Sequence, residues 1–318
     1  MRRHTAWSRI VARVVLPVLV LGVLAASPAG AVAPGTAPVD PPAGGFAIDG
    51  NLQANVPVAG IGDWLPGAAG SGGNVLNAAG GAVVGGATFR LIDTFNNGSD
   101  DNFQGGQKFD QNPNGWTWVA NPVSPKTDIN NGLLHFTTDP VTKHSWLVFA
   151  GDRMSNNGDA YIDFEFLQNV LTVTGSIPAG GGGFSSSGPN GGRTVNDLLV
   201  TLSLTQGGST AGFFVDRWES IGGGKFDYVD HTAAAPAGSV YGAVNTTPAP
   251  VSFGAFGGTT YPTNTFAEGA IDLTALLGAI DPCLSIGVKT ILIKTKTSQS
   301  PTATITDFIT PATAKSWS

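Results

Sequence analysis

The stretch GDRMSNNGDAYIDFEF, residues 151–166, decides the fold of this chain because its second half alternates between polar and apolar side chains. Every second position is apolar, at Ile162, Phe164 and Phe166. Alternation with a period of two is typical of a β-strand that has one face in a core and one face in water. The positions between them therefore predict a solvent-exposed row, and a candidate site, at Tyr161, Asp163 and Glu165.

The composition indicates many short strands rather than long helices. The 318 residues include 45 Gly and 21 Pro, and only 12% of the residues are charged. Gly and Pro favour turns, and such turns separate further alternating stretches, for example residues 195–205. Only Ala270–Ala279, with Asp272 as a cap, indicates a helix. The sequence therefore predicts an all-β fold, an antiparallel β-sandwich or jelly roll of the concanavalin-like kind, with one short helix.

The N-terminal residues have the pattern of a secretory signal. Four arginines precede an apolar run over residues 14–26, and Ala29-Gly30-Ala31 offers small residues to a signal peptidase. We expect a signal peptide over 1–31, a disordered or extended Pro/Gly/Ala-rich linker over 32–45, and a single β-sandwich domain over 46–318. The apolar run is shorter than the roughly 20 residues of a membrane span. The mature protein is therefore expected to be secreted, without a transmembrane anchor.

The charge of the chain argues against nucleic acid as a partner. The sequence has 16 Lys+Arg and 22 Asp+Glu, a net charge of −6. Loss of the four signal arginines would leave 12 basic against 22 acidic residues, a net charge of −10. An acidic surface repels a phosphate backbone and attracts cations. The single cysteine, Cys283, cannot form an internal disulfide, and we expect it either to be buried or to pair between chains.

Several motifs together resemble a family of secreted proteins of actinobacterial type. They are FAIDGN at 46–51, GDW at 62–64, PKTDI at 125–129, GDRMSNNGDAYIDFEF at 151–166, GGRTVNDLL at 191–199 and the late segment 281–309. The resemblance extends over nearly the whole mature chain. It implies export, a lectin-like β-sandwich and a place at the bacterial surface, often N-terminal to repeat or wall-anchoring modules. It implies no established catalytic residues, and this chain differs from the longer members in stopping at Ser318.

The polar row is similar in part to the catalytic strand of jelly-roll glycoside hydrolases. Those enzymes place Glu-x-Asp-x-Glu along one strand so that two carboxylates about 5 Å apart flank the sugar bond. Here Tyr161 stands in place of the first Glu, so we predict no catalytic residue. The simpler interpretation is that Asp163 and Glu165 face outward and pair with a cross-strand partner such as Lys126 or Arg217.

Aromatic side chains are the other candidates for binding a sugar. Tryptophan suits sugar stacking when it is exposed, although most tryptophans in a sandwich belong to the core. Trp116 and Trp118 share one strand face, so they should be buried together or exposed together. The predicted ligand-binding set joins the polar row to one tryptophan and two charged side chains: Tyr161, Asp163, Glu165, Asp128, Arg217 and Trp118.

Oxygen-rich loops make calcium the one candidate cofactor. Asp152, Asn157 and Asp159 lie within eight residues, and hard cations bind several oxygen ligands in a flexible loop. Asp100-Asp101-Asn102 is a second oxygen-rich segment. The competing interpretation is that Asn and Gly in these turns serve left-handed backbone conformations. No histidine has a nucleophile context, and no Cys/His spacing fits zinc.

Two functions are consistent with these observations. The first is a secreted, non-enzymatic β-sandwich protein of the bacterial exterior that binds cell-surface or environmental glycans or acts in adhesion. The alternative is a polysaccharide-active enzyme, similar to glycoside hydrolases, on a jelly-roll fold. Whether Tyr161, Asp163 and Glu165 line a groove or lie beneath another strand distinguishes them.

Overall fold

The computed structural model describes residues 30–95, 100–280, 287–300 and 302–313. In that part of the chain the strands form two large sheets and two small ones, and every pairing between them is antiparallel. The predicted all-β sandwich class is therefore confirmed. The finer jelly-roll connectivity stays a prediction.

The larger sheet has eleven strands in the order β1-β13-β12-β9-β19-β20-β5-β6-β11-β10, with β14 beside β13. The strand predicted from the quoted stretch, β9, lies near its middle, between β12 and β19. The strands of this sheet are β1 (Gly30–Ala31), β5 (Asp101–Phe103), β6 (Thr117–Ala120), β9 (Ala160–Leu167), β10 (Leu171–Ser176), β11 (Gly181–Ser186), β12 (Leu198–Thr205), β13 (Thr210–Gly222), β14 (Lys225–Asp230), β19 (Thr290–Lys296) and β20 (Ile305–Thr313).

The second large sheet has five strands in the order β15-β18-β8-β7-β4, and two small sheets pair β16 with β17 and β2 with β3. These strands are β2 (Gly35–Ala37), β3 (Phe46–Ile48), β4 (Thr88–Ile92), β7 (Asn131–Thr138), β8 (Ser145–Asp152), β15 (Val240–Val244), β16 (Ala249–Ala255), β17 (Gly258–Tyr261) and β18 (Phe266–Asp272).

Four short helical segments complete the fold: η1 (Pro113–Gly115), η2 (Ile177–Ala179), η3 (Thr232–Ala234) and α1 (Leu273–Ile280). Asp272 Oδ1 accepts a hydrogen bond from the backbone N–H of Ala275 at 2.8 Å. An acidic side chain at this position satisfies a backbone donor of the first helical turn. The predicted helix and its predicted cap are confirmed, but the helix begins at Leu273 rather than at Ala270, because residues 270–272 belong to β18.

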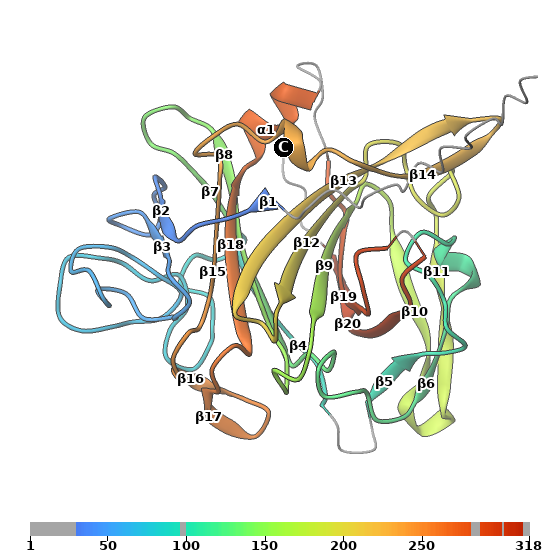
Figure 1. The fold of residues 1–318 in the computed structure, drawn as a ribbon, viewed down its shortest axis with the longest axis horizontal. Coiled ribbons are helices and arrows are strands. Elements are labelled where there is room, and N and C mark those ends of the chain that lie inside the picture. The colour runs from blue at the N-terminus through green and yellow to red at the C-terminus, as the bar shows by residue number, and fades with distance from the viewer. Residues whose placement is uncertain (1–29, 96–99, 281–286, 301, 314–318) are drawn as a thin grey trace, which may run out of the picture.

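The sheets stack as layers, with the five-stranded sheet against the middle strands of the large sheet (Figure 1). The core between them takes Phe149 from β8 and Phe164 from β9, whose ring centroids are 5.2 Å apart. Ile162 and Phe166 are buried in the same core. The predicted apolar face of the quoted stretch is therefore confirmed.

A second core fills the other side of the five-stranded sheet, under the N-terminal segment. Phe46 packs edge-on against Trp64, with ring centroids 4.9 Å apart. Ala37 and Val39 belong to this core too, at 0% and 2% exposure. The predicted linker over 32–45 is therefore wrong in part, because β2 and the residues after it are packed into the fold. Small apolar side chains close to β3 make this packing possible.

Some predictions for the ends of the chain concern residues that are not described. Residues 1–29 of the predicted signal peptide lie outside the described residues, as does Cys283. The predicted cleavage point after Ala31 coincides with the end of β1, where Ala31 pairs with Gly212 of β13. Within the described residues, no helix has the length and apolar character needed to cross a membrane.

A third core forms because the large sheet curls over on itself. Its far strands β5, β6, β11 and β10 bring Phe103, Trp118 and Phe184 against Leu292 and Phe308 of the middle strands. The segment 180–192 begins with four consecutive glycines, a composition typical of flexible segments, but it contributes the strand β11. A Cβ on Gly182 would lie 1.8 Å from the carbonyl oxygen of Thr174, so only glycine allows this approach between β10 and β11.

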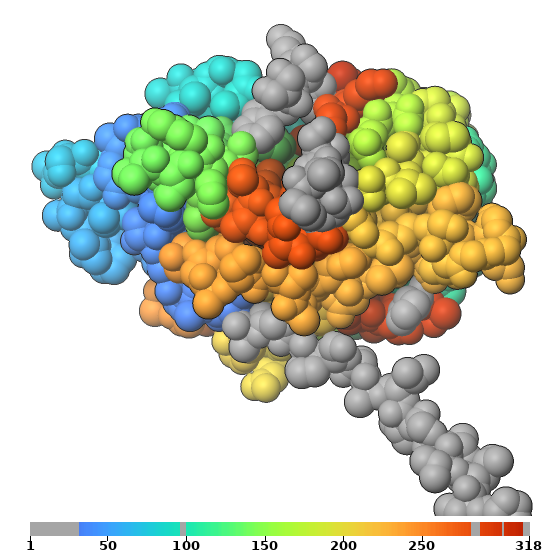
Figure 2. Space-filling model, turned by 90° about the horizontal axis from the view of Figure 1, so that it is seen from above, coloured from blue at the N-terminus to red at the C-terminus, as the bar shows by residue number. Residues whose placement is uncertain are grey.

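The molecule is elongated across its layers. In Figure 2 the N-terminal residues, in blue, lie at one end, and the β10–β11 region, in yellow-green, lies toward the other. The β13–β14 hairpin projects from the body at this second end (Figure 1). The third core and the base of this hairpin frame the candidate site.

Candidate functional site

The polar row of β9 does not face water. Asp163 and Glu165 are both 0% exposed, and Tyr161 is half-buried. The predicted solvent-exposed face is therefore wrong. The alternation was identified correctly, but the curled sheet covers the polar face of β9 with the third core.

Opposite charges from neighbouring segments meet these carboxylates. Lys296 Nζ lies 2.8 Å from Asp163 Oδ1, and Lys294 Nζ forms an ion pair with Glu165 Oε2. Arg193 Nε donates to Glu165 Oε1 at 2.6 Å. All five side chains are fully removed from solvent. We call Asp163, Glu165, Arg193, Lys294 and Lys296 the buried ionic cluster.

Hydrogen bonds and aromatic rings complete the environment of Arg193. Its Nη1 donates to the carbonyl of Gln111 at 2.9 Å, and its Nη2 donates to that of Phe109 at 2.7 Å. The guanidinium carbon lies 4.7 Å from the ring centroid of Trp218 and 5.0 Å from that of Tyr228. Planar donors and stacking on aromatic faces are what make arginine suited to a buried ion pair.

The buried ionic cluster stabilises the ionised form of Glu165. Burial alone would raise the pKa of this carboxyl, but the charges of Arg193 and Lys294 outweigh burial and lower the pKa to about 2. Tyr228 also donates to Glu165 Oε1 at 2.7 Å. A carboxylate that is inaccessible and ionised at neutral pH cannot exchange a proton with a substrate, so Glu165 is structural.

The remaining members of the predicted ligand-binding set do not join this strand at a surface. Asp128 is 0% exposed and Trp118 is 4% exposed, so both lie inside the protein. Trp118 is buried with Trp116, as their shared face predicted. Arg217 is partly exposed and pairs with Glu219, its Nε 2.5 Å from Glu219 Oε1. The structure therefore does not bring the predicted ligand-binding set together at one accessible surface.

The predicted calcium loop is also divided between interior and surface. Asp152 is 1% exposed, and its carboxylate accepts four hydrogen bonds, from the backbone N–H groups of Asn130 and Asn131, from Asn131 Nδ2 and from the hydroxyl of Tyr261. Four donors occupy the acceptor sites of a carboxylate. Asn157 and Asp159 are exposed. Asp152 thus links β8 to β7 and β17 through hydrogen bonds. Calcium binding by this loop stays a prediction.

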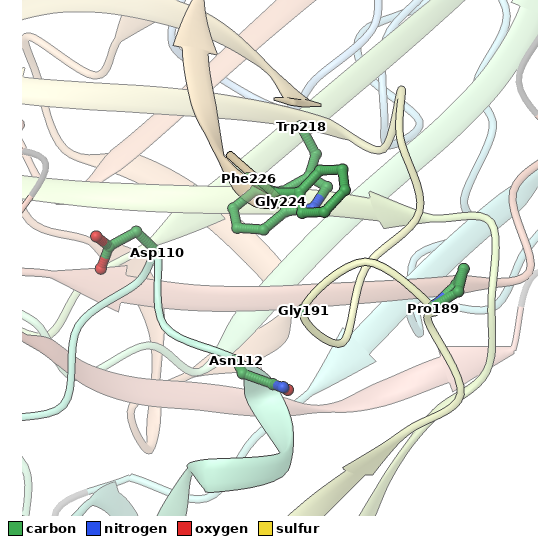
Figure 3. Close-up of a pocket in the computed structure, with 7 residues that line it drawn as sticks. All are labelled: Asp110, Asn112, Pro189, Gly191, Trp218, Gly224 and Phe226. Carbon is green, nitrogen blue, oxygen red and sulfur yellow. The ribbon is translucent and has the colours of Figure 1, made fainter. Parts of the chain in front are cut away.

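A pocket of about 330 Å³, drawn in Figure 3, lies next to Arg193 of the buried ionic cluster, because Arg193 stacks on the ring of Trp218 in the pocket wall. In Figure 3, Trp218 and Phe226 lie together on one side, Asn112 lies across from them, and Asp110 lies at the left of the view. We call this site the aromatic pocket; it is lined by Asp110, Asn112, Pro189, Gly191, Trp218, Gly224 and Phe226.

The buried ionic cluster holds the walls of the aromatic pocket in place. Trp218, from β13, is 2% exposed, donates from Nε1 to the carbonyl of Asn190 at 2.8 Å and packs edge-on against Tyr228. Arg193 fixes the chain just before Asn112 through its bond to Gln111. Phe226, from β14, is only half-buried and supplies the accessible apolar surface.

Asp110 is the one acidic side chain among the residues that line the aromatic pocket. Burial first, and then the charge of Asp227, raises its pKa. Among the described residues, Asp110 Oδ1 has no hydrogen-bond donor. The pocket therefore presents an apolar wall, an amide and a carboxyl group, the Oδ1 atom of which is itself buried.

Sequence reasoning missed the basic half of the buried ionic cluster. The segment TILIKTK, residues 290–296, places Lys294 and Lys296 on the same face of a strand, with the spacing of Asp163 and Glu165. Two strands with complementary alternating charges are a signal for cross-strand pairing. Nothing local indicates Arg193, which lies in a Gly-rich turn.

Comparisons with protein-family models, with curated proteins and with solved structures found no match to this chain. The class that the structure itself defines is an all-β sandwich with a partly aromatic pocket at one end.

Proposed function

We propose that this protein is a non-enzymatic binding protein of the bacterial exterior, and that it binds a neutral carbohydrate in the aromatic pocket. The observation that carries the proposal is the combination of Phe226 and Trp218 with Asp110 and Asn112 around one pocket. Sugars bind through an apolar ring face that stacks on an aromatic side chain and through hydroxyls that donate to carboxyl and amide oxygens.

The charge of the site supports a neutral ligand. Asp110 and Asp227 are close enough for the charge of one to raise the pKa of the other, and the whole chain carries a net charge of −6. An anionic sugar would be repelled by these groups. The volume of about 330 Å³ suits one or two sugar rings.

The test of this proposal is the substitution Phe226→Ala. A panel of neutral oligosaccharides of glucose, galactose, mannose and N-acetylglucosamine is titrated into the protein by calorimetry. We expect at least one to bind, and we expect Phe226→Ala to weaken its binding about tenfold, because a stacking contact is worth about 0.5–1.5 kcal/mol beyond the buried area. The matched control is Ile221→Ala on the same hairpin, where the side chain is 54% exposed and does not line the pocket.

The proposal is wrong if no oligosaccharide binds, or if both substitutions leave the affinity unchanged. A hydrolysed oligosaccharide would instead support the alternative, a polysaccharide-active enzyme. One observation favours that alternative, namely the raised pKa of Asp110 beside a second carboxylate, Asp227. Loss of hydrolysis in Asp110→Asn, with binding retained, would establish it.

A further inference from the structure

Four carboxylates come together where β4, β5 and β20 meet, away from the residues that line the aromatic pocket. Asp93 follows β4, Asp100 and Asp101 stand at the start of β5, and Asp307 lies in β20, opposite Asn102. One oxygen from each of the four lies within 4.8 Å of the others. We call Asp93, Asp100, Asp101 and Asp307 the acidic cluster.

Three members of the acidic cluster have no basic partner among the described residues. In the described part of the chain, no lysine, arginine or histidine forms an ion pair with Asp93, Asp101 or Asp307. Four carboxylates this close together repel one another when they are ionised, and a bound cation would offset that repulsion.

Two buried oxygens of the acidic cluster have no donor. Asp93 Oδ2 and Asp101 Oδ1 are inaccessible to water and accept no hydrogen bond from any described residue, and each residue is 9% exposed. Asp307, by contrast, accepts from the backbone N–H groups of Ile129 at 2.8 Å and Phe308 at 3.0 Å, which fix its orientation. Buried polar atoms are normally satisfied, so two such oxygens in one group point to a ligand.

We propose that the acidic cluster binds one calcium ion. Calcium takes oxygen ligands at about 2.3–2.6 Å, so two ligands on opposite sides of one ion are roughly 4.6–5.2 Å apart. One oxygen from each carboxylate lies within 4.8 Å of the others, so all four are close enough to surround one such ion. Magnesium usually keeps several waters and binds only one or two carboxylates, so a group of four carboxylates favours calcium. This site shares no residue with the 152–159 loop and is independent of carbohydrate binding.

The experiment compares calcium binding by the full chain and by two variants. The protein is freed of metal with EDTA, and calcium chloride is titrated in by calorimetry. We expect one ion per chain, a melting temperature that is about 5 °C or more higher in millimolar calcium than in EDTA, and a weaker response to magnesium. Asp101→Asn removes a ligand charge and should lower the affinity about tenfold or more. Asp159→Asn, in the exposed loop, is the matched control and should bind like the wild type.

The melting temperature in EDTA shows whether the Asp101→Asn variant is folded when no metal is bound. Asp101→Asn relieves repulsion within the metal-free cluster, so this variant should melt in EDTA at or above the temperature of the wild type. Equal calcium affinity in Asp101→Asn and in the wild type would overturn the proposal. Loss of binding in Asp159→Asn, with binding kept in Asp101→Asn, would also overturn it and assign the ion to the 152–159 loop. Identical wild-type melting curves in calcium and in EDTA would mean that the cluster holds no ion.

Discussion

Glu165 accepts hydrogen bonds from Arg193, Tyr228 and Lys294, although no part of it reaches water. Removal of a charge from water is costly, and the cost is offset only when each group is paired and its remaining hydrogen-bonding sites are satisfied. The buried ionic cluster meets this condition at Glu165. The pairing of Glu165 therefore explains how charged side chains can alternate with apolar ones on a strand whose two faces are both buried.

Glu165→Gln should destabilise the protein by about 3–5 kcal/mol, because it leaves the charges of Arg193 and Lys294 without a carboxylate. The free energy of unfolding in guanidinium chloride at pH 6 measures this loss. The control is Glu219→Gln, which removes a partly exposed partner of Arg217 and should cost only about 0–1 kcal/mol. Similar small losses in both variants would contradict the structural role of Glu165.

The difference in unfolding free energy between the wild type and Glu165→Gln should depend on pH in a defined direction. The pKa of Glu165 is about 2 in the folded protein, below its ordinary value of 4.5. A lowered pKa gives stability that is present above pH 4.5 and is lost as the pH falls toward 2. The difference in unfolding free energy between wild type and Glu165→Gln should therefore shrink over that window.

At the scale of the element, β9 is a central strand with two different buried faces. One face carries Phe164 against Phe149 of the opposing sheet. The other carries Asp163, paired with Lys296 and hydrogen-bonded by Thr201 at 2.6 Å. Alternation predicted the strand and its apolar face correctly. It could not predict the second burial, because period two separates the faces of a strand without stating what covers each one.

Substitutions on the two faces of β9 should have comparable effects. Phe164→Ala should cost about 3–5 kcal/mol through the cavity it leaves. Asp163→Asn should also cost about 3–5 kcal/mol, because Lys296 and Lys294 lose their counter-charge. Chemical denaturation measures both, with the half-buried Tyr161→Phe as the control at the end of the strand. A change below about 0.5 kcal/mol for Asp163→Asn would mean that this face is solvated after all.

Other elements show where local sequence was sufficient. The helix α1 begins after Asp272, which caps it, and a short apolar run follows. Both signals are local in the sequence, so the helix could be predicted. The strand β11 was missed, because four consecutive glycines indicate flexibility unless a close neighbour requires them. That neighbour is β10, and the distance of 1.8 Å from a Cβ on Gly182 to Thr174 depends on how the strands pair.

At the scale of the whole molecule, the layer order decides which groups are accessible. The curl of the large sheet depends on pairings between distant segments, such as Gly182 of β11 with Trp118 of β6. The acidic cluster likewise joins Asp93 to Asp307, from opposite parts of the chain. The sequence identified Asp100 and Asp101 as oxygen-rich, but no local pattern connects them with Asp307. The class of fold was therefore predictable, and the sites made by layer contacts were not.

The measurement that tests the proposed function most directly is the response of the tryptophan indole N–H signals to a bound sugar by NMR. The indoles report on different layers: Trp218 lines the aromatic pocket, whereas Trp64 donates to Glu268 deep in the N-terminal core. Saturation with the best-binding oligosaccharide of the neutral panel should shift the assigned signal of Trp218 and leave that of Trp64 unchanged. An unchanged Trp218 signal, an equal shift of both signals, or a panel in which no oligosaccharide binds would contradict carbohydrate binding in the aromatic pocket.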